Sequence, residues 1–583
     1  MLLLKLNSYS QLMNSAFELK DVQHKNNNEL KIVPIGGVEE IGINCTAYEY
    51  KSDIVVIDCG LGFPENDQYG VDYLIPNVDF LKKNIKKIKG IFITHSHYDH
   101  IGALDLVLKR LKFPAVYAPP FASEIIKHKL KETKILQRTK IIVYRESDIF
   151  NFQFFHVTFF RVTHSTPDSY GIILKTPIGN IIHTGDFKFD NSPIDEVPSN
   201  YLKIAKAGSE GVIALLSDST NAFKKGFSKS ELEVKEILKD VVEKSNGRLI
   251  FATFSQLVTR INQLLQTAIL FNRKVAISGR SLELTINIAR RLKYINVPDN
   301  LFVSLKSIYK LPLQKQMIFV TGHQGETMAA LSRIARGEHK DVKIQKGDTV
   351  ILSSSVIPGN DVLVQKMIDD LSKQGARVFH QGILDLHAGG HGYQEDQKLM
   401  INLTKPKFFI PIHGYHSFLS EHIRTAISLG MKENHCIIAN NGEEIIINKN
   451  SIRRGKKYKS TPVIVSGLGV GDIGEIVLSE RDKLANFGII IVQANINKAK
   501  RKLFVEPEII TKGFVFEKAY RGLLNNVQKL ASNIIKQGIN SNKSIKQIKT
   551  NIEKQILKYV KKEIEREPMI IAIINAYENQ SHT

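Results

Sequence analysis

The stretch that most constrains the fold is residues 93–102 (ITHSHYDHIG), which holds His95, His97, Asp99 and His100. The apolar run just before these histidines is rich in β-branched and aromatic residues and predicts a buried strand. Two imidazoles two residues apart can point at one metal ion, and the adjacent Asp99 and His100 can serve a second. Imidazole and carboxylate ligands without a thiolate suit Zn²⁺, with Mn²⁺ as a poorer fit. We therefore expect a metal centre at a strand end, in preference to a hydrogen-bonded surface cluster.

Two metal ions need more ligands than this stretch supplies. Other predicted strands end in polar residues that could serve: Asp58 in VVIDCG, His164 in VTHS, Asp186 in HTGDF and His413 in FFIPIHG. Taken singly, each is more often an ordinary polar residue than a ligand. Only the set as a whole indicates a metal centre.

The pattern of apolar runs divides the chain into parts. Short strands dominate from residue 31, strands alternate with helices from about 228, and short strands return over 378–447. Residues 228–245 read as an amphipathic helix that begins with a Ser/Glu capping box. A long helix with an apolar Ile stripe lies near the C-terminus. The predicted parts are an extension (1–28), a first domain in two pieces (29–226 and 379–448), an inserted α/β domain (227–378), a basic linker (449–461) and a C-terminal domain (462–583).

Composition limits the partners and the compartment. The 583 residues suffice for several domains, and Lys+Arg at 80 against Asp+Glu at 58 gives a net charge of +22. Such an excess suits a nucleic acid or an anionic membrane, although codon bias could also supply many lysines. The three cysteines form no CxxC pair, which favours a reducing cytoplasm. No apolar run is long enough to span a membrane, and the N-terminus does not read as a signal peptide.

Residues 469–474 (GVGDIG) match the GxGxxG pattern of dinucleotide-binding loops. We interpret them as a turn, because the following EIVLSERDKL does not read as the long helix that accepts a pyrophosphate. No βαβ unit frames them either.

Asp58, the HSHYDH stretch, His164 and Asp186 in this order resemble the metallo-β-lactamase superfamily. The resemblance implies an αββα sandwich with its metals at the strand ends. One metal would be held by His95, His97 and His164, and the other by Asp99, His100 and His413. Asp186 would bridge the two metals, Asp58 would support the ligand loop, and a hydroxide between the ions would be the nucleophile.

Further blocks resemble the β-CASP nucleases, and more closely the ribonuclease J family. They are VPIGGVEEIGIN (33–44), SDSTNA (217–222), TGHQGETMAALSRIARGEH (321–339), GDTVILSSSVIPGN (347–360), HAGGHGYQEDQKLM (387–400) and KPKFFIPIHG (405–414). The resemblance runs from about residue 30 to 450 and continues more weakly to the C-terminus. It implies a cytoplasmic, zinc-dependent ribonuclease with 5′→3′ exonuclease and endonuclease action in RNA processing and decay. It also implies a homodimer, a tetramer or a hetero-oligomer with a paralogue, with RNA-degradation partners.

The resemblance assigns roles around the substrate as well. His391 would donate a proton to the leaving 3′-oxygen, with Asp218 holding its ring; the alternative is a structural loop histidine. The phosphate pocket would involve His387, Ala388, Gly389, Gly390, His391, Gln256, Leu257 and Val258. This pocket departs from the family pattern, because Gly389 stands where serine is usual and Gln256–Val258 replaces an SN-type contact. We therefore expect weaker dependence on a 5′-monophosphate. The resemblance also implies that a third, structural cation can bind near Asp72 and an acidic residue such as Glu443; the alternative is that Asp72 is a plain loop aspartate.

Two other functions fit parts of the pattern. A paralogue that serves as an RNA-binding scaffold would explain the altered phosphate pocket, but it has no need of a complete ligand set. A hydrolase of a small ester or thioester would use the same metals, but it would need neither the inserted domain nor the basic charge.

Overall fold

The computed structural model describes residues 28–64, 68–194, 197–322, 329–353, 356, 360–384, 388–497, 500, 502–515 and 518–577. The chain forms two compact units. The first comprises Met1–Gly60 and Val78–Ser460, and the second comprises Leu61–Asn77 and Thr461–Thr583. Residues 1–27 of the predicted N-terminal extension lie outside the described residues, and so does His387.

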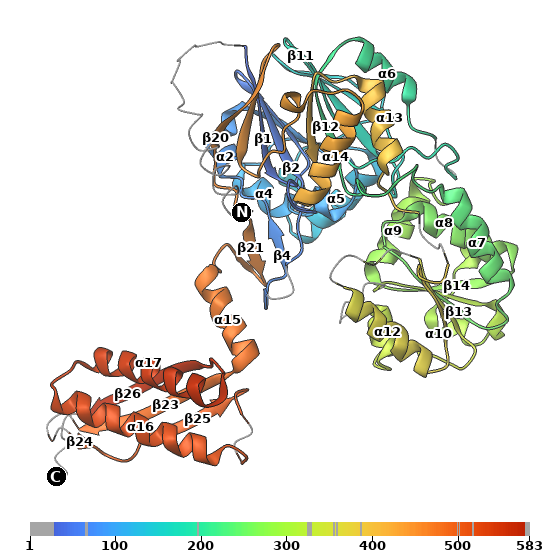
Figure 1. Ribbon diagram of the computed structural model, residues 1–583. Coiled ribbons are helices and arrows are strands. Elements are labelled where there is room, and N and C mark those ends of the chain that lie inside the picture. Colours follow the sequence, from blue (N-terminus) through green and yellow to red (C-terminus); the bar gives the residue numbers. More distant parts are fainter. Residues whose placement is uncertain are drawn as a thin grey trace, which may run out of the picture. The chain divides into compact units, whose positions relative to one another are not determined.

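Two sheets pack face to face in the first unit and form the expected sandwich (Figure 1). Their apolar inner faces share one core, to which Tyr48, Phe92, Phe159 and Leu216 belong. In order across the eight-stranded sheet the strands are β20 (Ile452–Lys457), β19 (Glu443–Ile447), β1 (Leu30–Gly36), β2 (Cys45–Tyr50), β3 (Asp53–Ile57), β5 (Ile88–Phe92), β6 (Val116–Ala118) and β7 (Ile141–Val143). Across the six-stranded sheet they are β18 (Phe408–Ile412), β12 (Val212–Asp218), β11 (Gly179–His183), β10 (Tyr170–Thr176), β9 (His156–Arg161) and β8 (Phe150–Asn151).

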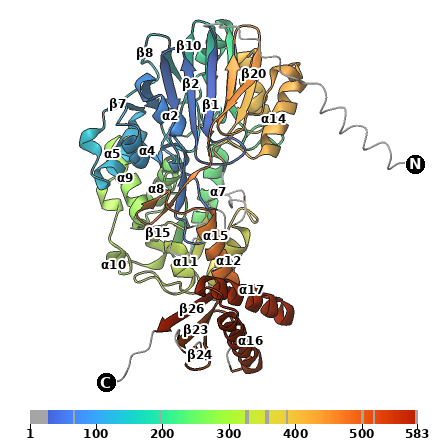
Figure 2. The same cartoon turned by 90° about the vertical axis from the view of Figure 1, so that its left-hand side faces the viewer.

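Helices cover the outer faces of the sandwich. The six-stranded sheet has a second apolar face, which packs against α6 (Tyr201–Ser209), α13 (Gln394–Thr404) and α14 (His416–Ser428). Along the eight-stranded sheet lie α2 (Asp79–Lys83), α4 (Leu104–Arg110) and α5 (Pro120–Glu132), as Figure 2 shows. The αββα architecture inferred from the sequence is therefore confirmed.

The inserted domain is a five-stranded parallel sheet flanked by helices. Its strands in order are β14 (Lys274–Ser278), β15 (Gln316–Val320), β13 (Leu249–Ala252), β16 (Thr349–Leu352) and β17 (Arg377–Phe379). Its helices are α7 (Glu231–Glu243), α8 (Val258–Leu270), α9 (Arg280–Arg291), α10 (Leu305–Ile308), α11 (Ala330–Ala335) and α12 (Asp361–Lys373). The predicted capping box is present, with Ser230 as the N-cap of α7 and Glu233 three residues later.

Hydrogen bonds from the sandwich fix the start of the insert. Asp190 accepts from the backbone N–H of Glu231 (2.9 Å) and from the Ser230 hydroxyl (2.8 Å). Asp396 accepts from the N–H groups of Ser228 (2.8 Å) and Phe189 (2.9 Å). These carboxylates anchor the crossing into the inserted domain to the sandwich.

The second unit holds two small sheets. One contains β22 (Gly469–Val470), β21 (Val463–Ser466) and β4 (Tyr73–Ile75); the other contains β24 (Lys502–Leu503), β23 (Ile489–Asn497), β25 (Glu508–Lys512) and β26 (Met569–Tyr577). The helices are α15 (Glu475–Phe487), α16 (Arg521–Asn540) and α17 (Ile545–Ile564). The predicted Ile stripe of α17 packs with α16 against one face of the larger sheet, so it is a core face.

Three predictions about organisation were wrong. Residues 449–461 are not a linker, because β20 within them pairs with β19 as the edge strand of the eight-stranded sheet. Its exposed Arg and Lys side chains are typical of an edge strand, which hydropathy alone does not reveal. The segment after GVGDIG does form a helix, α15, although the preceding β22 is a two-residue antiparallel strand and not part of a βαβ unit. Leu61–Asn77 belongs to the second unit, because β4 pairs with β21.

Among the described residues, no helix is both long and apolar enough to cross a membrane.

Candidate metal centre

The candidate ligands lie just beyond the carboxyl ends of strands. Asp58 follows β3, the HSHYDH stretch follows β5, Asp186 follows β11 and His413 follows β18. β3 runs parallel to β5 in one sheet, and β11, β12 and β18 run parallel to one another in the other sheet, so the carboxyl ends share one edge within each sheet. The contact of His100 Nε2 with Asp186 Oδ2 (3.2 Å) shows that the two edges adjoin. The fold therefore gathers residues that are far apart in the sequence.

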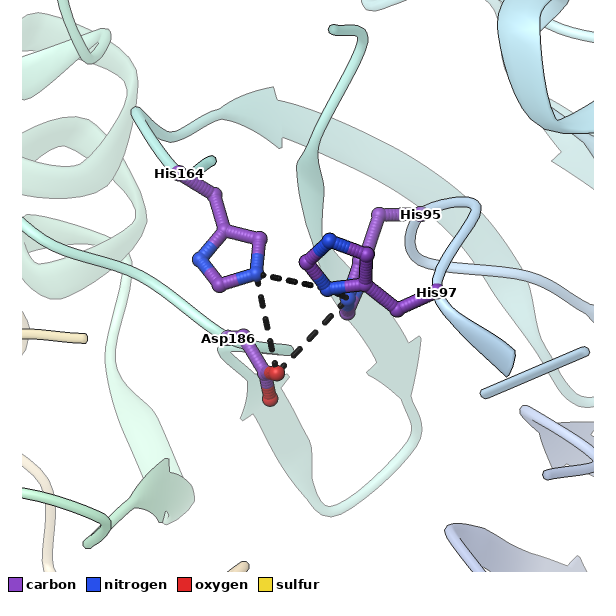
Figure 3. Close-up of side chains that lie close together, drawn as sticks. All are labelled: His95, His97, His164 and Asp186. Carbon is purple, nitrogen blue, oxygen red and sulfur yellow. Dashed lines mark hydrogen bonds and ion pairs between the residues drawn. The ribbon is translucent and has the colours of Figure 1, made fainter. Parts of the chain in front are cut away.

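The first group consists of His95, His97, His164 and Asp186 (Figure 3). His97 Nδ1 lies 3.1 Å from both His95 Nε2 and His164 Nε2. Asp186 Oδ2 lies 3.6 Å from His95 Nε2 and 3.8 Å from His164 Nε2. Ligand atoms about 3.3 Å apart are the edges of a tetrahedron around Zn²⁺ with bonds of about 2.0–2.1 Å. The donor set and its spacing fit such an ion.

The second group shares Asp186 and adds Asp99, His100 and His413. His100 Nε2 lies 3.2 Å from Asp186 Oδ2 and 3.3 Å from Asp99 Oδ2. His413 Nε2 lies 3.3 Å from Asp99 Oδ2. The two groups match the ligand sets that the resemblance implied, including the position of Asp186 between them; metal binding itself stays a prediction.

Hydrogen bonds to the ring nitrogens that face away from the site orient two of the imidazoles. His100 Nδ1 donates to Asp58 Oδ2 (2.7 Å), and His164 Nδ1 donates to the carbonyl of Gly390 (2.6 Å). Each bond turns the Nε2 atom of that ring toward the site. Such outer partners fix the ring and the tautomer of metal-binding histidines.

Two threonines that the sequence analysis did not predict also hydrogen-bond to the groups around the ligands. The Thr94 hydroxyl donates to Asp58 Oδ2 (2.9 Å) and lies 3.0 Å from His95 Nδ1. The Thr220 hydroxyl donates to Asp218 Oδ1 (2.7 Å) and lies 2.8 Å from His413 Nδ1. Both therefore link a carboxylate to an imidazole, and only the distance between side chains in the fold identifies them.

Burial and charge set the protonation of the groups. Burial lowers the pKa of His97 to about 4 and that of His164 well below its usual range, which keeps both rings neutral as ligands must be. Burial acts in the same direction on His100, but the carboxylates of Asp186 and Asp99 outweigh it and hold its pKa well above the usual range. The carboxylates of the second group therefore favour a positive charge beside them, which a bound metal ion would supply in place of the proton on His100.

The backbone is unusual where it brings these loops together. Asp58 has φ +61° and His413 has φ +54°, a left-handed conformation that few non-glycine residues adopt. A Cβ on Gly60 would lie 1.5 Å from the carbonyl oxygen of Asp99, and one on Gly390 would lie 2.5 Å from the His164 ring. Glycine is required at both positions because backbone and ligand approach so closely.

Beside the second group lies the pair His391 and Asp218. His391 Nδ1 donates to Asp218 Oδ2 (2.7 Å), which leaves the Nε2 atom of the partly exposed ring for a substrate. Burial acts to lower the pKa of His391, but Asp218 outweighs it and raises that pKa.

Three parts of the chain match families of known proteins. Residues 38–229 match the metallo-beta-lactamase superfamily, residues 246–371 the ribonuclease J beta-CASP domain and residues 476–577 the ribonuclease J C-terminal domain. Ribonuclease J 1 of Streptococcus pyogenes is 37% identical over 548 residues, covering 94% of this chain and 98% of its own. Ribonuclease J2 of Bacillus subtilis is 37% identical over 555 residues (95% of this chain and 100% of its own). Ribonuclease J of Synechocystis sp. is 38% identical over 558 residues (94% and 86%). The chain belongs to the ribonuclease J family.

The expected phosphate pocket is less well defined than the metal centre. The side chains of Gln256, Leu257 and Val258 are buried at the start of α8, and the N–H groups of Leu257 and Val258 donate to backbone carbonyls. A phosphate contact through these N–H groups is therefore not available in this conformation. Ala388 and Gly390 are buried beside the metal centre, while Gly389 is half-buried with space around it.

The third-cation expectation gains no support from the described residues. The Asp72 carboxylate accepts from the Gly467 N–H (2.6 Å), and Glu443 pairs with Arg454. Neither residue belongs to a potential metal-binding group within the described part of the chain.

Proposed function

We propose that this ribonuclease J family member hydrolyses RNA phosphodiester bonds with two Zn²⁺ ions bound by the adjacent ligand groups. The observation that carries the proposal is that two four-residue groups of His and Asp, each buried except for one half-buried member, share Asp186. Two cations at this spacing would activate water and stabilise negative charge on both the attacking oxygen and the leaving oxygen.

The residues of the chain then have separate tasks. His95, His97 and His164 hold one ion, and Asp99, His100 and His413 hold the other. Asp58 keeps the ring of His100 turned toward the site and fixes the ligand loop through the Thr94 N–H, 2.8 Å from its Oδ1. These positions are set before substrate arrives, so catalysis needs little rearrangement.

His391 acts as the general acid. Its Nδ1–H is held by Asp218, so its Nε2 can give a proton to the leaving 3′-oxygen of the RNA. Asp218 orients His391 directly and His413 through Thr220, and it thereby couples the acid to the second metal group.

We further propose 5′→3′ exonuclease and endonuclease action in RNA processing and decay. Weak 5′-monophosphate dependence follows from Gly389 and the buried Leu257 and Val258. A homo-oligomer or a hetero-oligomer with a paralogue, other RNA-degradation partners and a cytoplasmic location remain parts of this proposal. The net charge of +22 supports RNA as the partner.

The test uses one end-labelled RNA that carries either a 5′-monophosphate or a 5′-hydroxyl. Wild-type protein is compared with Asp99→Ala, and His156→Ala, which changes an exposed histidine of β9 outside the ligand groups, is the matched control. We expect metal-dependent cleavage by wild type and His156→Ala, at similar rates on both RNAs, and none by Asp99→Ala. Equal inactivity of wild type and Asp99→Ala with metal bound would contradict the proposal and favour an RNA-binding scaffold.

A further inference from the structure

Next to the metal centre lies a surface that the proposed reaction does not use. It combines aromatic rings with a lysine and comes from the loop after β12, the start of α13 and the start of α14. We call it the rim patch, and its residues are Phe223, Lys224, Tyr393, Tyr415 and Phe418.

The rim patch is attached to residues of the metal centre. Asn221 Nδ2 donates to the carbonyl of His391 (3.0 Å), so the loop that carries Phe223 is tied to the proposed acid. Tyr415 stands two residues after His413, and a Cβ on the intervening Gly414 would be 3.1 Å from the Cβ of Phe418. The patch therefore borders the position where the scissile phosphate would bind.

Its aromatic rings are unusually accessible. Phe223 is 53% exposed and Tyr415 is 45% exposed. Both contact the half-buried Phe418 edge to face, with ring centroids 5.6 and 5.5 Å away. This packing fixes the rings while leaving flat apolar surface in contact with water. A cluster of exposed aromatics beside a site is typical of a binding surface.

The charge around the rings is basic. Lys224 Nζ lies 5.1 Å from the centroid of the Tyr393 ring, and Lys225 beside it is exposed. Among the acidic side chains nearby, Glu421 pairs with Arg424 (2.9 Å), and Glu39 accepts a hydrogen bond from His416 (2.6 Å). Lys224 and Lys225 therefore offer positive charge to an anionic partner.

We propose that the rim patch binds unpaired nucleobases of the RNA strand next to the scissile phosphate. This inference rests on the proposed ribonuclease function. Bases stack on Phe223 and Tyr415, and Lys224 contacts a neighbouring phosphate. Exposed rings with adjacent lysines are how proteins hold single-stranded nucleic acid with little sequence preference. Bases inside a duplex present no free face, so the patch favours unpaired RNA at the cleavage site.

The first test separates base stacking from catalysis. Cleavage by wild type, Phe223→Ala, Phe223→Leu and Phe223→Trp is measured on a single-stranded RNA and on bis(p-nitrophenyl) phosphate, a diester without bases. Loss of one base stack lowers kcat/KM by roughly 5- to 150-fold. We expect such a loss on RNA for the Ala and Leu variants, retention for Trp, and unchanged hydrolysis of the small diester by all of them. Leu202→Ala, which removes an 81% exposed apolar side chain of α6, is the matched control and should behave as wild type.

The second test locates the base. A single abasic site is moved along the RNA, and binding is followed by fluorescence anisotropy with metal-free protein. At one position next to the cleavage site the abasic change should weaken binding by wild type but not by Phe223→Ala. Equal RNA binding and cleavage by wild type and Phe223→Ala would overturn the proposal and point to a protein partner for the patch. A wild type that binds RNA through Phe223 but cleaves none would refute the ribonuclease proposal alone.

Discussion

Replacing His391 by alanine tests the assignment of the general acid. His391 is 2.7 Å from Asp218 and its ring remains 22% exposed, so its Nε2 atom can reach a bound RNA. A positioned acid contributes about 10²–10⁴-fold, equivalent to about 2.7–5.5 kcal/mol of barrier. We expect kcat on RNA to fall by this factor, because the 3′-oxygen is a poor leaving group without a proton.

The assay compares two leaving groups. Cleavage of RNA is measured beside hydrolysis of a nucleoside p-nitrophenyl phosphate, whose phenolate leaves without protonation. His391→Ala should reduce the first reaction and change the second by less than about threefold, with metal content unchanged. Equal losses on both substrates would refute the role as an acid, and unchanged RNA cleavage would favour a structural loop histidine.

Three further predictions follow from local packing and charge. Gly60→Ala places a Cβ 1.5 Å from the carbonyl oxygen of Asp99, so we expect the free energy of unfolding to fall by at least about 2 kcal/mol and bound metal to be lost. Thermal unfolding and metal analysis measure the two effects. The control Gly474→Ala, whose Cβ would meet nothing within 4 Å, should change neither stability nor metal content. A Cβ added at Gly389 would meet no atom closer than 3.8 Å, so Gly389→Ser should fold normally and should raise the preference for 5′-monophosphate over 5′-hydroxyl RNA. An unchanged ratio of the two cleavage rates would contradict the proposal that Gly389 weakens 5′-monophosphate dependence. Burial lowers the pKa of His422 to about 3, so the unfolded chain binds the proton before the folded chain does, and stability should fall as the pH drops below about 6.5. His422→Gln should reduce this pH dependence of stability, measured by denaturation curves at several pH values. Identical pH dependence in wild type and variant would show that His422 does not contribute.

The candidate ligands could be found in the sequence because they stand at the ends of predicted strands, but their division into two groups came from the resemblance to the metallo-β-lactamase superfamily. The structure brings the members of each group together, whereas metal binding stays a prediction. Thr94 and Thr220 were missed because a hydroxyl between a carboxylate and an imidazole leaves no sequence signature.

Errors in the fold arose where local composition and tertiary pairing disagree. Residues 452–457 are basic and polar, as a linker would be, yet β20 completes a sheet that β1 and β19 begin. The long helix α16 was not predicted, although its apolar residues pack beside α17. Leu61–Asn77 joins a domain that starts some 400 positions later, which no local pattern indicates.

The most direct test of the two-metal account is a metal titration of chelated protein with activity measured on the same samples. The account predicts an inactive apo-protein, two Zn²⁺ per chain at full RNA cleavage, and fewer in Asp186→Ala, which lacks the residue common to both groups. Full RNA cleavage by metal-free protein, or unchanged metal content and activity in Asp186→Ala, would contradict it.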